Sequence, residues 1–261
     1  MNKTIHRQGE TNTKIFDNRT LEADYSTIAS ILKPGLKILD VGCGTGAISK
    51  GIAERVGGTG YVIGIDNTEH FIVSGRETYR DVPNLTLIHA DLFRYEPVEK
   101  FDLIVAARVL QWLNNPREAI SKLKSFLKPG GQLSILDYNH SALEWKPQPP
   151  DSMQAFYKAF LKWRADAGMN NQIADDLPGY FTELNFHSIE TYNADEVYKK
   201  GDHNFIQRIG IWSKVAELKQ IVEEGYIDEQ SKLKTIEEYN FWIENKAEWM
   251  IMKLKEVRGK I

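Results

Sequence analysis

The chain has 261 residues, of which 42% are apolar and 26% charged, and its formal net charge is −3. This length and composition suit one embellished globular domain or two small ones, and they argue against wholesale disorder. The single cysteine excludes an intrachain disulfide framework and a cysteine-cluster metal site, and the slight acidity gives no reason to expect a nucleic-acid partner.

The start of the chain and its apolar runs bear on membrane insertion. Residues 1–14 are polar and lack the apolar middle region of a signal peptide. The longest apolar runs, such as residues 103–107, have the length of a strand and cannot span a bilayer. We therefore expect a cytoplasmic protein without membrane insertion.

From residue 37 onward, short apolar runs alternate with amphipathic stretches. The apolar runs predict strands over 37–41, 60–66, 85–91, 101–109 and 132–138. The amphipathic stretches predict helices over 45–56, from about 69, and over 117–127, the last one stopped by the sequence KPGG at 128–131. This alternation predicts βαβ units and a doubly wound, mostly parallel sheet with helices on both faces.

The regular alternation of predicted strands and helices ends after residue 139. A helix is expected over 152–167, a strand over 188–193, and two long helices over 203–224 and 229–246. Residues 248–257 alternate apolar and polar side chains at period two, which is typical of an antiparallel strand.

The sequence DVGCGTG, at residues 40–46, contains the end of the first predicted strand and the glycine-rich turn that follows it. Its glycines at 42, 44 and 46 permit tight turning and close approach of a ligand to the backbone. The spacing GxGxG differs from the GxGxxG of dinucleotide-binding proteins. Asp66 ends the second strand, where a carboxylate can accept hydrogen bonds from both hydroxyl groups of a ribose. Asp40 directly precedes the turn, where it can face a cationic amino group.

The sequence HADL stands at the end of the third predicted strand, and LKPGG leads into the fifth. Together with the glycine turn and Asp66, these motifs have the order and spacing of class I S-adenosylmethionine-dependent methyltransferases, which the chain resembles over about residues 35–138. The resemblance implies a seven-stranded Rossmann-like sheet whose last strand is antiparallel, with helical cap additions. It also implies S-adenosylmethionine as cofactor, S-adenosylhomocysteine as product and no metal. The residues that it assigns to the cofactor are Asp40, Gly42, Cys43, Gly44, Gly46, Asp66, Asn67, Asp91, Leu92 and Ala107.

Several of these residues have ordinary structural alternatives. The glycines can form a plain strand-to-helix turn, and Asp66 and Asp91 can cap the segments that follow them. Cys43 is interpreted as a small turn residue, because no activating partner for a thiol is visible. Arg19, in the arm before the sheet, can pair with the methionine carboxylate of the cofactor or lie in solvent.

The acceptor is expected beyond the carboxyl ends of the strands. After strand four, the sequence VLQWL resembles small-molecule carboxyl methyltransferases, with Gln111 facing the substrate and Trp112 either in the pocket or in the core. After strand five, His140 is the candidate general base, because its usual pKa is near physiological pH, and Tyr138 the candidate orienting group. The alternative for His140 is a solvent-facing loop position. Trp145, Trp163 and Arg164 belong to a segment that can form either a lid or a packed helix.

We interpret the chain as one methyltransferase domain of residues 1–261. It consists of an arm (1–34), a cofactor-binding core (35–139), a cap insertion (140–176) and C-terminal strands and helices (177–261). The expected function is methyl transfer to a small organic acceptor by in-line displacement. The alternatives are a protein or RNA acceptor, or a cofactor-binding protein without transferase activity. The two long C-terminal helices depart from the compact ending of quinone methyltransferases, and the sequence leaves the oligomeric state open.

Overall fold

The computed structural model describes residues 19–261. The first 18 residues of the predicted N-terminal arm lie outside this description. The described residues group into two compact units. We call the first the sheet unit; it comprises residues 19–137, Ile173–Ala194 and Lys255–Ile261. The second, the helical unit, comprises Tyr138–Gln172 and Asp195–Leu254. The assignment of the chain to a single domain stays a prediction.

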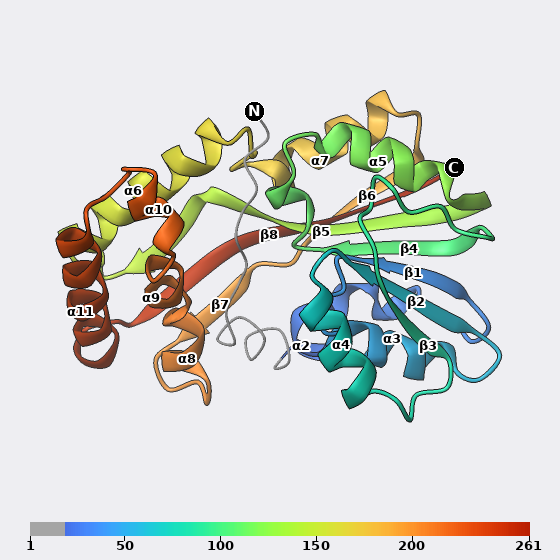
Figure 1. The fold of residues 1–261 in the computed structure, drawn as a ribbon, viewed down its shortest axis with the longest axis horizontal. Helices are drawn as coiled ribbons and strands as arrows, with labels where there is room; N and C mark the ends of the chain where they lie inside the picture. The colour runs from blue at the N-terminus through green and yellow to red at the C-terminus, as the bar shows by residue number, and fades with distance from the viewer. Residues whose placement is uncertain (1–18) are drawn as a thin grey trace. The chain divides into compact units, whose positions relative to one another are not determined.

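The sheet unit is built on seven strands in the order β3-β2-β1-β4-β5-β8-β6 (Figure 1). Their bounds are Lys37–Val41 for β1, Tyr61–Asp66 for β2, Leu85–His89 for β3, Phe101–Ala107 for β4, Leu127–Lys146 for β5, His187–Asn193 for β6 and Trp249–Lys260 for β8. Neighbouring strands from β3 to β5 are parallel, whereas β8 runs antiparallel to β6. This confirms the predicted Rossmann-like topology with an antiparallel last strand.

Helices cover both faces of this sheet. Figure 1 shows α3 (Ala47–Val56) and α4 (Glu69–Thr78) on one side and α5 (Pro116–Ser125) and α7 (Ile173–Glu183) on the other. The strands β1 and β4 are buried almost throughout, because both of their faces pack against helices. Short helical segments lie before β1 and after β4: α2 (Leu21–Asp24), η1 (Ser26–Ser30) and η2 (Leu110–Trp112).

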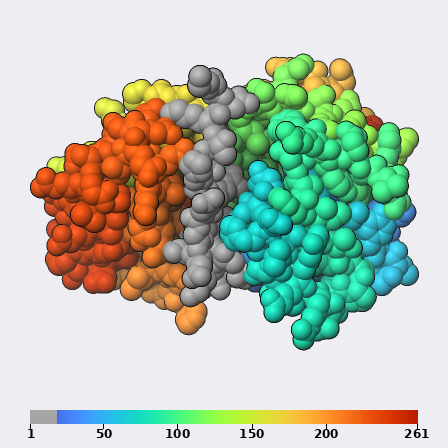
Figure 2. Space-filling view, viewed as in Figure 1, coloured from blue at the N-terminus to red at the C-terminus, as the bar shows by residue number. Residues whose placement is uncertain are grey.

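The helical unit contains α6 (Asp151–Asp166), β7 (Glu196–Lys199), α8 (Phe205–Ile209), α9 (Ile211–Ala216), α10 (Lys219–Glu223) and α11 (Glu229–Asn245). The strand β7 pairs antiparallel with the first half of β8. Figure 2 shows α8 to α11 as one continuous orange-to-red surface. Its core is aromatic, with Trp212 in edge-to-face contact with Trp145, Tyr157 and Phe160. Such pairs add stabilisation beyond the buried apolar area.

Two predicted elements differ from the structure. The expected helix over 203–224 is three short helices, because the chain bends at Gly210 and leaves helical geometry at Leu218, where ψ is 112°. The fifth strand begins at Leu127 and continues to Lys146 instead of spanning 132–138, so the predicted KPGG turn lies inside an irregular stretch of β5. The predicted border between the cofactor-binding core and the cap insertion, after residue 139, consequently falls within a strand.

Candidate functional site

The glycine turn connects the carboxyl end of β1 to the start of α3. Gly42, Gly44 and Gly46 have φ values of 67°, 60° and 86°, a region that residues with a side chain rarely adopt. A Cβ atom at Gly42 would overlap the side chain of Val109, and one at Gly46 would lie 2.8 Å from Leu87. All three glycines are therefore required by the conformation of this turn.

Asp40 is buried at the end of β1, with 2% of its surface exposed. The Ser49 hydroxyl of α3 donates a hydrogen bond to Asp40 Oδ2 at 2.5 Å. Burial raises the pKa of Asp40 to about 7, against the lowering effect of the Ser49 hydrogen bond, and the nearby Asp66 carboxylate raises it further. A cation placed beside Asp40 would favour its ionised form, which makes this position suited to a positively charged ligand group.

Asp66, at the end of β2, contacts the glycine turn directly. Its Oδ2 accepts from the backbone N–H of Gly44 at 3.0 Å, and its Oδ1 accepts from that of Thr68 at 2.9 Å. Thr68, rather than Asp66, is the N-cap of α4. Asp66 thus links the turn to the start of α4. The neighbouring Asn67 has its carbonyl oxygen 3.2 Å from Nε2 of His89.

The other turn residues differ in their bonding. Burial and the two nearby carboxylates raise the pKa of the Cys43 thiol well above its usual value, which favours the neutral form. This agrees with its interpretation as a small turn residue. The hydroxyl of Thr45 is buried and makes no hydrogen bond to the described residues.

After β3, Asp91 is exposed, and its Oδ1 accepts from the backbone N–H groups of Phe93 and Arg94 at 2.9 and 3.2 Å. Asp91 therefore caps the turn that follows, which confirms the capping role given above as the alternative for this residue. Its contact with adenine stays a prediction. Leu92 is buried. Arg19 is half-buried and directly precedes Thr20, the N-cap of α2. The pairing of Arg19 with a cofactor carboxylate stays a prediction.

After β4, the half-buried Ala107 ends the strand, and η2 carries Gln111 and Trp112. The backbone N–H of Gln111 donates to Oδ2 of the buried Asp137 at 3.1 Å. The Gln111 side chain is buried and donates to the carbonyl of Arg108 at 3.2 Å. Trp112 is half-buried. Gln111 is thus held within the turn, and its expected contact with a substrate stays a prediction.

The two candidate catalytic residues lie on β5 in the helical unit. His140 is buried, so its alternative as a solvent-facing loop residue is wrong, because β5 extends past residue 138. Burial, followed by the charge of Arg164, holds the pKa of His140 well below its usual value. Its ring lies 5.2 Å from that of Tyr138, and the Tyr138 hydroxyl donates to Glu196 at 3.3 Å. The imidazole is therefore neutral at physiological pH.

The three residues assigned to a cap are all buried in the helical unit. Trp145 Nε1 donates to the Tyr239 hydroxyl at 3.1 Å, and Trp163 Nε1 donates to Glu224 at 3.0 Å. Arg164 Nε donates to the side-chain oxygen of Asn171 at 2.8 Å. They hold the packed interior of this unit together.

The structure thus brings the turn, Asp40, Cys43 and Asp66 together in direct contact. Sequence reasoning missed three polar residues at this edge of the sheet unit. Ser49 donates to Asp40, Thr45 lies within the glycine turn, and Asp137 accepts from the backbone of Gln111. Their signals are weak, because single Ser, Thr and Asp residues next to a glycine turn are common helix starts. It also missed β7, whose Glu196 accepts from both Tyr138 and Tyr198.

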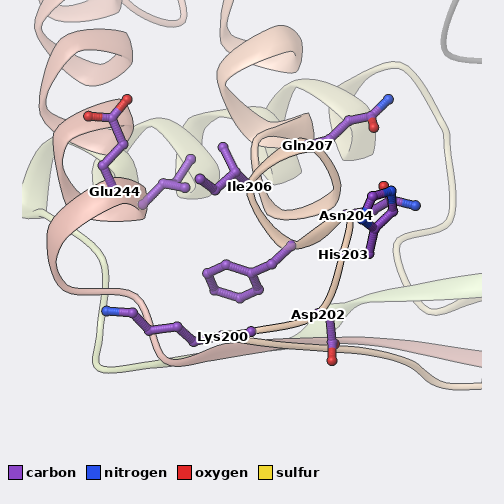
Figure 3. Close-up of a pocket in the computed structure, with 10 residues that line it drawn as sticks. Lys200, Asp202, His203, Asn204, Ile206, Gln207 and Glu244 are labelled. Atoms are coloured by element: carbon purple, nitrogen blue, oxygen red, sulfur yellow. The ribbon is translucent and has the colours of Figure 1, made fainter.

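A separate pocket of about 460 Å³ lies in the helical unit (Figure 3). It is lined by residues 200–207 together with Ile243 and Glu244 of α11. None of the predicted site residues lines it. Among the described residues there is no group of three or more histidine, cysteine or acidic side chains placed to hold a metal ion, and no helix long and apolar enough to cross a membrane.

Comparison with known sequences gives a consistent family. A family model described as a methyltransferase domain matches residues 32–238. A ubiquinone/menaquinone biosynthesis C-methyltransferase from Hydrogenovibrio crunogenus is 30% identical over 174 residues, covering 65% of this chain and 64% of the relative. A demethylmenaquinone methyltransferase from Staphylococcus saprophyticus is 31% identical over 134 residues, covering 51% of this chain and 54% of the relative. The chain spans less than two thirds of the length of these curated relatives.

Solved structures share the fold. A SAM-dependent methyltransferase from Aquifex aeolicus matches with a TM-score of 0.55 and 16% identity, covering 98% of this chain and 100% of that one. A phosphoethanolamine N-methyltransferase from Haemonchus contortus, in complex with S-adenosyl-L-methionine, gives 0.60 at 15% identity, covering 98% of this chain and 58% of that one.

Proposed function

The chain belongs to the methyltransferase domain family, and on this premise we propose that it transfers a methyl group from S-adenosylmethionine to a small organic acceptor. The observation that carries the proposal is the glycine turn packed against two buried carboxylates, Asp40 and Asp66. Glycines permit close approach of a ligand to the backbone of a turn, and the carboxylates suit a molecule with both a cationic group and a ribose.

The residues present fit this cofactor. Asp40 would hold the methionine amino group, Asp66 the ribose, and Asp91 with the backbone of Leu92 the adenine. S-adenosylmethionine supplies a methyl group on a sulfonium, whose departure as a neutral thioether drives the transfer. The protein then needs mainly to align the acceptor and exclude water.

Tyr138 and His140 are the residues proposed to act on the acceptor. The neutral imidazole of His140 can accept the proton that a protonated acceptor loses as its bond to the methyl carbon forms. Tyr138 lies beside it and can orient the acceptor. The names of the Hydrogenovibrio and Staphylococcus relatives support testing demethylmenaquinone first among acceptors. The resemblance of the sequence VLQWL, at residues 109–113, to small-molecule carboxyl methyltransferases supports including carboxylic acids in the same panel.

The test is incubation of the purified protein with methyl-labelled S-adenosylmethionine and a cellular extract, followed by mass identification of the labelled product. We expect one labelled small molecule. A labelled protein or RNA would favour the alternative acceptor class, and saturable cofactor binding without any labelled product would favour a non-catalytic binding protein. The expectations of a cytoplasmic location and of no nucleic-acid partner stay predictions.

The Asp66→Ala variant should weaken S-adenosylmethionine binding by about ten-fold or more, because the ribose hydroxyls lose their acceptor. Asp81→Ala is the matched control, since the Asp81 side chain is 92% exposed and pairs with Arg80 at 3.7 Å. Calorimetric titration of both variants checks the role. An affinity in Asp66→Ala equal to that of the control would remove Asp66 from the cofactor site.

A further inference from the structure

The residue that follows β4 has a backbone conformation that is rare for a residue with a side chain. Arg108 has φ of 61° and is buried, with 5% of its surface exposed. Such a conformation persists only where the surroundings impose it. Glycine would adopt this backbone conformation at a lower cost in free energy, so the presence of arginine indicates that its side chain has a function at this position.

Arg108 is bonded through both backbone and side chain. Its N–H donates to the carbonyl of Leu136 in β5 at 2.7 Å. Its carbonyl accepts from the Gln111 side chain, and its Nη2 donates to the carbonyl of Asp24, at the end of α2, at 2.9 Å. A single residue thus joins the turn after β4 to the strand β5 and to the helix α2.

The turn that Arg108 starts lies on the glycine turn. Val109 occupies the space in which Gly42 would otherwise carry a Cβ atom. Two residues later, the N–H of Gln111 reaches Asp137 at the adjoining part of β5. The left-handed conformation of Arg108 directs the chain so that both contacts form.

The side chain of Arg108 reaches the glycine turn by a second path. The helix α2 packs so closely on α3 that a Cβ atom at Gly51 would lie 2.7 Å from Leu21. Gly46, the last residue of the glycine turn, is the N-cap of α3. The bond from Arg108 to Asp24 therefore connects the turn after β4 to the helix that leaves the glycine turn.

We propose that Arg108 is a positioning residue for the methyl-transfer site, holding the 109–112 turn against the glycine turn by tying it to α2. This inference rests on the proposed function, because the turn carries Gln111 and Trp112 and follows Ala107, the residues assigned to acceptor and cofactor. Arg108 acts through these neighbours.

The first test needs no ligand. Arg108→Gly retains the backbone conformation and removes the guanidinium group. Hydrogen exchange of the Gln111 amide should become about ten-fold faster in this variant, because the turn loses its tie to α2. Arg55→Ala is the control, since Arg55 also contacts α2 through an exposed pair with Glu22 at 3.3 Å. Exchange in Arg108→Gly equal to that in the control would overturn the proposal.

The second test measures the reaction. The KM for S-adenosylmethionine should rise about ten-fold in Arg108→Gly, and Arg108→Lys, which keeps one donor and the charge, should recover part of the loss. A glycine variant with lower thermal stability but an unchanged KM would overturn the positioning role. If the unmodified protein binds no S-adenosylmethionine, the proposed function fails, while the exchange result still decides how Arg108 holds the turn. If the glycine variant does not fold, Arg108→Lys carries both measurements.

Discussion

The carboxyl group of Asp40 changes its charge near neutral pH, because burial raises its pKa to about 7 from a usual value of 3.8. The groups that face it are the Asp66 carboxylate, the Ser49 hydroxyl, the Tyr25 hydroxyl and the Cys43 thiol. Burial raises the pKa values of Tyr25 and Cys43 well above their usual values, so both stay neutral. The charge change near pH 7 therefore belongs to Asp40.

The native state binds the Asp40 proton more tightly than the unfolded chain does, so the ligand-free protein is more stable when Asp40 is protonated. This contribution is complete below about pH 4 and is lost as the pH rises to about 7, and it amounts to about 4 kcal/mol. Replacing Asp40 by asparagine should remove it. The melting temperature of the wild type should then fall relative to that of Asp40→Asn between pH 4 and pH 7. Parallel melting curves over this range would contradict the raised pKa.

The same pKa predicts proton release on ligand binding. A cation beside Asp40 favours the ionised carboxylate, so S-adenosylmethionine should bind more tightly as the pH rises from 6 to 8. Calorimetry in two buffers that differ in ionisation enthalpy should detect about one proton released at pH 6 and much less at pH 8. Asp40→Asn should show none at either pH, and equal release from this variant would assign the proton to another group.

The lowered pKa of His140 sets the pH range in which it can act as a base. A neutral imidazole accepts a proton, so a base role requires pH values above this lowered pKa. Between pH 6 and 8 the protonation state of His140 should therefore stay constant and should not change the rate. We expect a fall in rate only at more acidic pH, and we expect His140→Phe, which preserves the aromatic packing, to be slow at all pH values. A steady-state pH profile checks this, and an unchanged rate in His140→Phe would remove His140 as the base.

At the level of single residues, the conformation of the glycine turn and its contact with the acid at the end of β2 were predictable from the sequence, whereas the burial of His140 and Arg164 was not. Glycines at positive φ and acids at strand ends leave a local pattern that spacing reveals, as at Gly42, Gly46 and Asp66. The burial of His140 and Arg164 depends on tertiary packing within the helical unit, which leaves no pattern in the neighbouring sequence.

Among the elements, β8 is anchored by an ion pair buried in the sheet unit. Arg258 donates to both oxygens of Glu256, at 2.6 and 3.0 Å, and Ser134 of β5 donates to Glu256 Oε1 at 2.5 Å. The hydroxyls of Ser134 and Tyr25 lie 2.7 Å apart, and Arg258 also donates to the carbonyl of Thr27. This network joins β8 to β5 and to the segment before β1.

Breaking this pair should be costly, because Arg258 would remain as a buried charge without its carboxylate. Glu256→Ala is expected to lower the free energy of unfolding by about 3–5 kcal/mol. The exposed pair of Lys50 and Glu54, 2.8 Å apart, is the comparison, and Glu54→Ala should cost less than about 1 kcal/mol. Denaturant unfolding measures both values. Equal losses would show that the buried network contributes no more than a surface pair.

Elements with a regular apolar pattern were predicted well, such as β1, β4 and α11. The bounds predicted for helices and strands were wrong where the spacing of apolar residues follows no single helix or strand period. The fifth strand is longer than expected because residues 139–146, which carry a mixed polar and aromatic pattern, continue β5. The helix α7 was missed because Pro178 and Gly179 discourage a helix assignment, yet Pro178 lies inside it. The four-residue strand β7 is too short for periodicity to reveal.

For the whole molecule, the length beyond the cofactor-binding core corresponds largely to the helical unit. The cofactor candidates, from Asp40 to Ala107, belong to the sheet unit, whereas Tyr138, His140 and Trp145 belong to the helical unit. The strands β5 and β8 contribute residues to both units. The family match over residues 32–238 includes parts of both units. Differences of acceptor specificity are therefore to be sought in the helical unit and in η2 of the sheet unit, which carries Gln111 and Trp112.

The measurement that tests the central claim most directly is a calorimetric titration of the purified chain with S-adenosylmethionine and, separately, with NAD. The account predicts saturable binding of S-adenosylmethionine with one site per chain, lost or greatly weakened in Asp66→Ala, and no binding of NAD. Tight binding of NAD without binding of S-adenosylmethionine would contradict it.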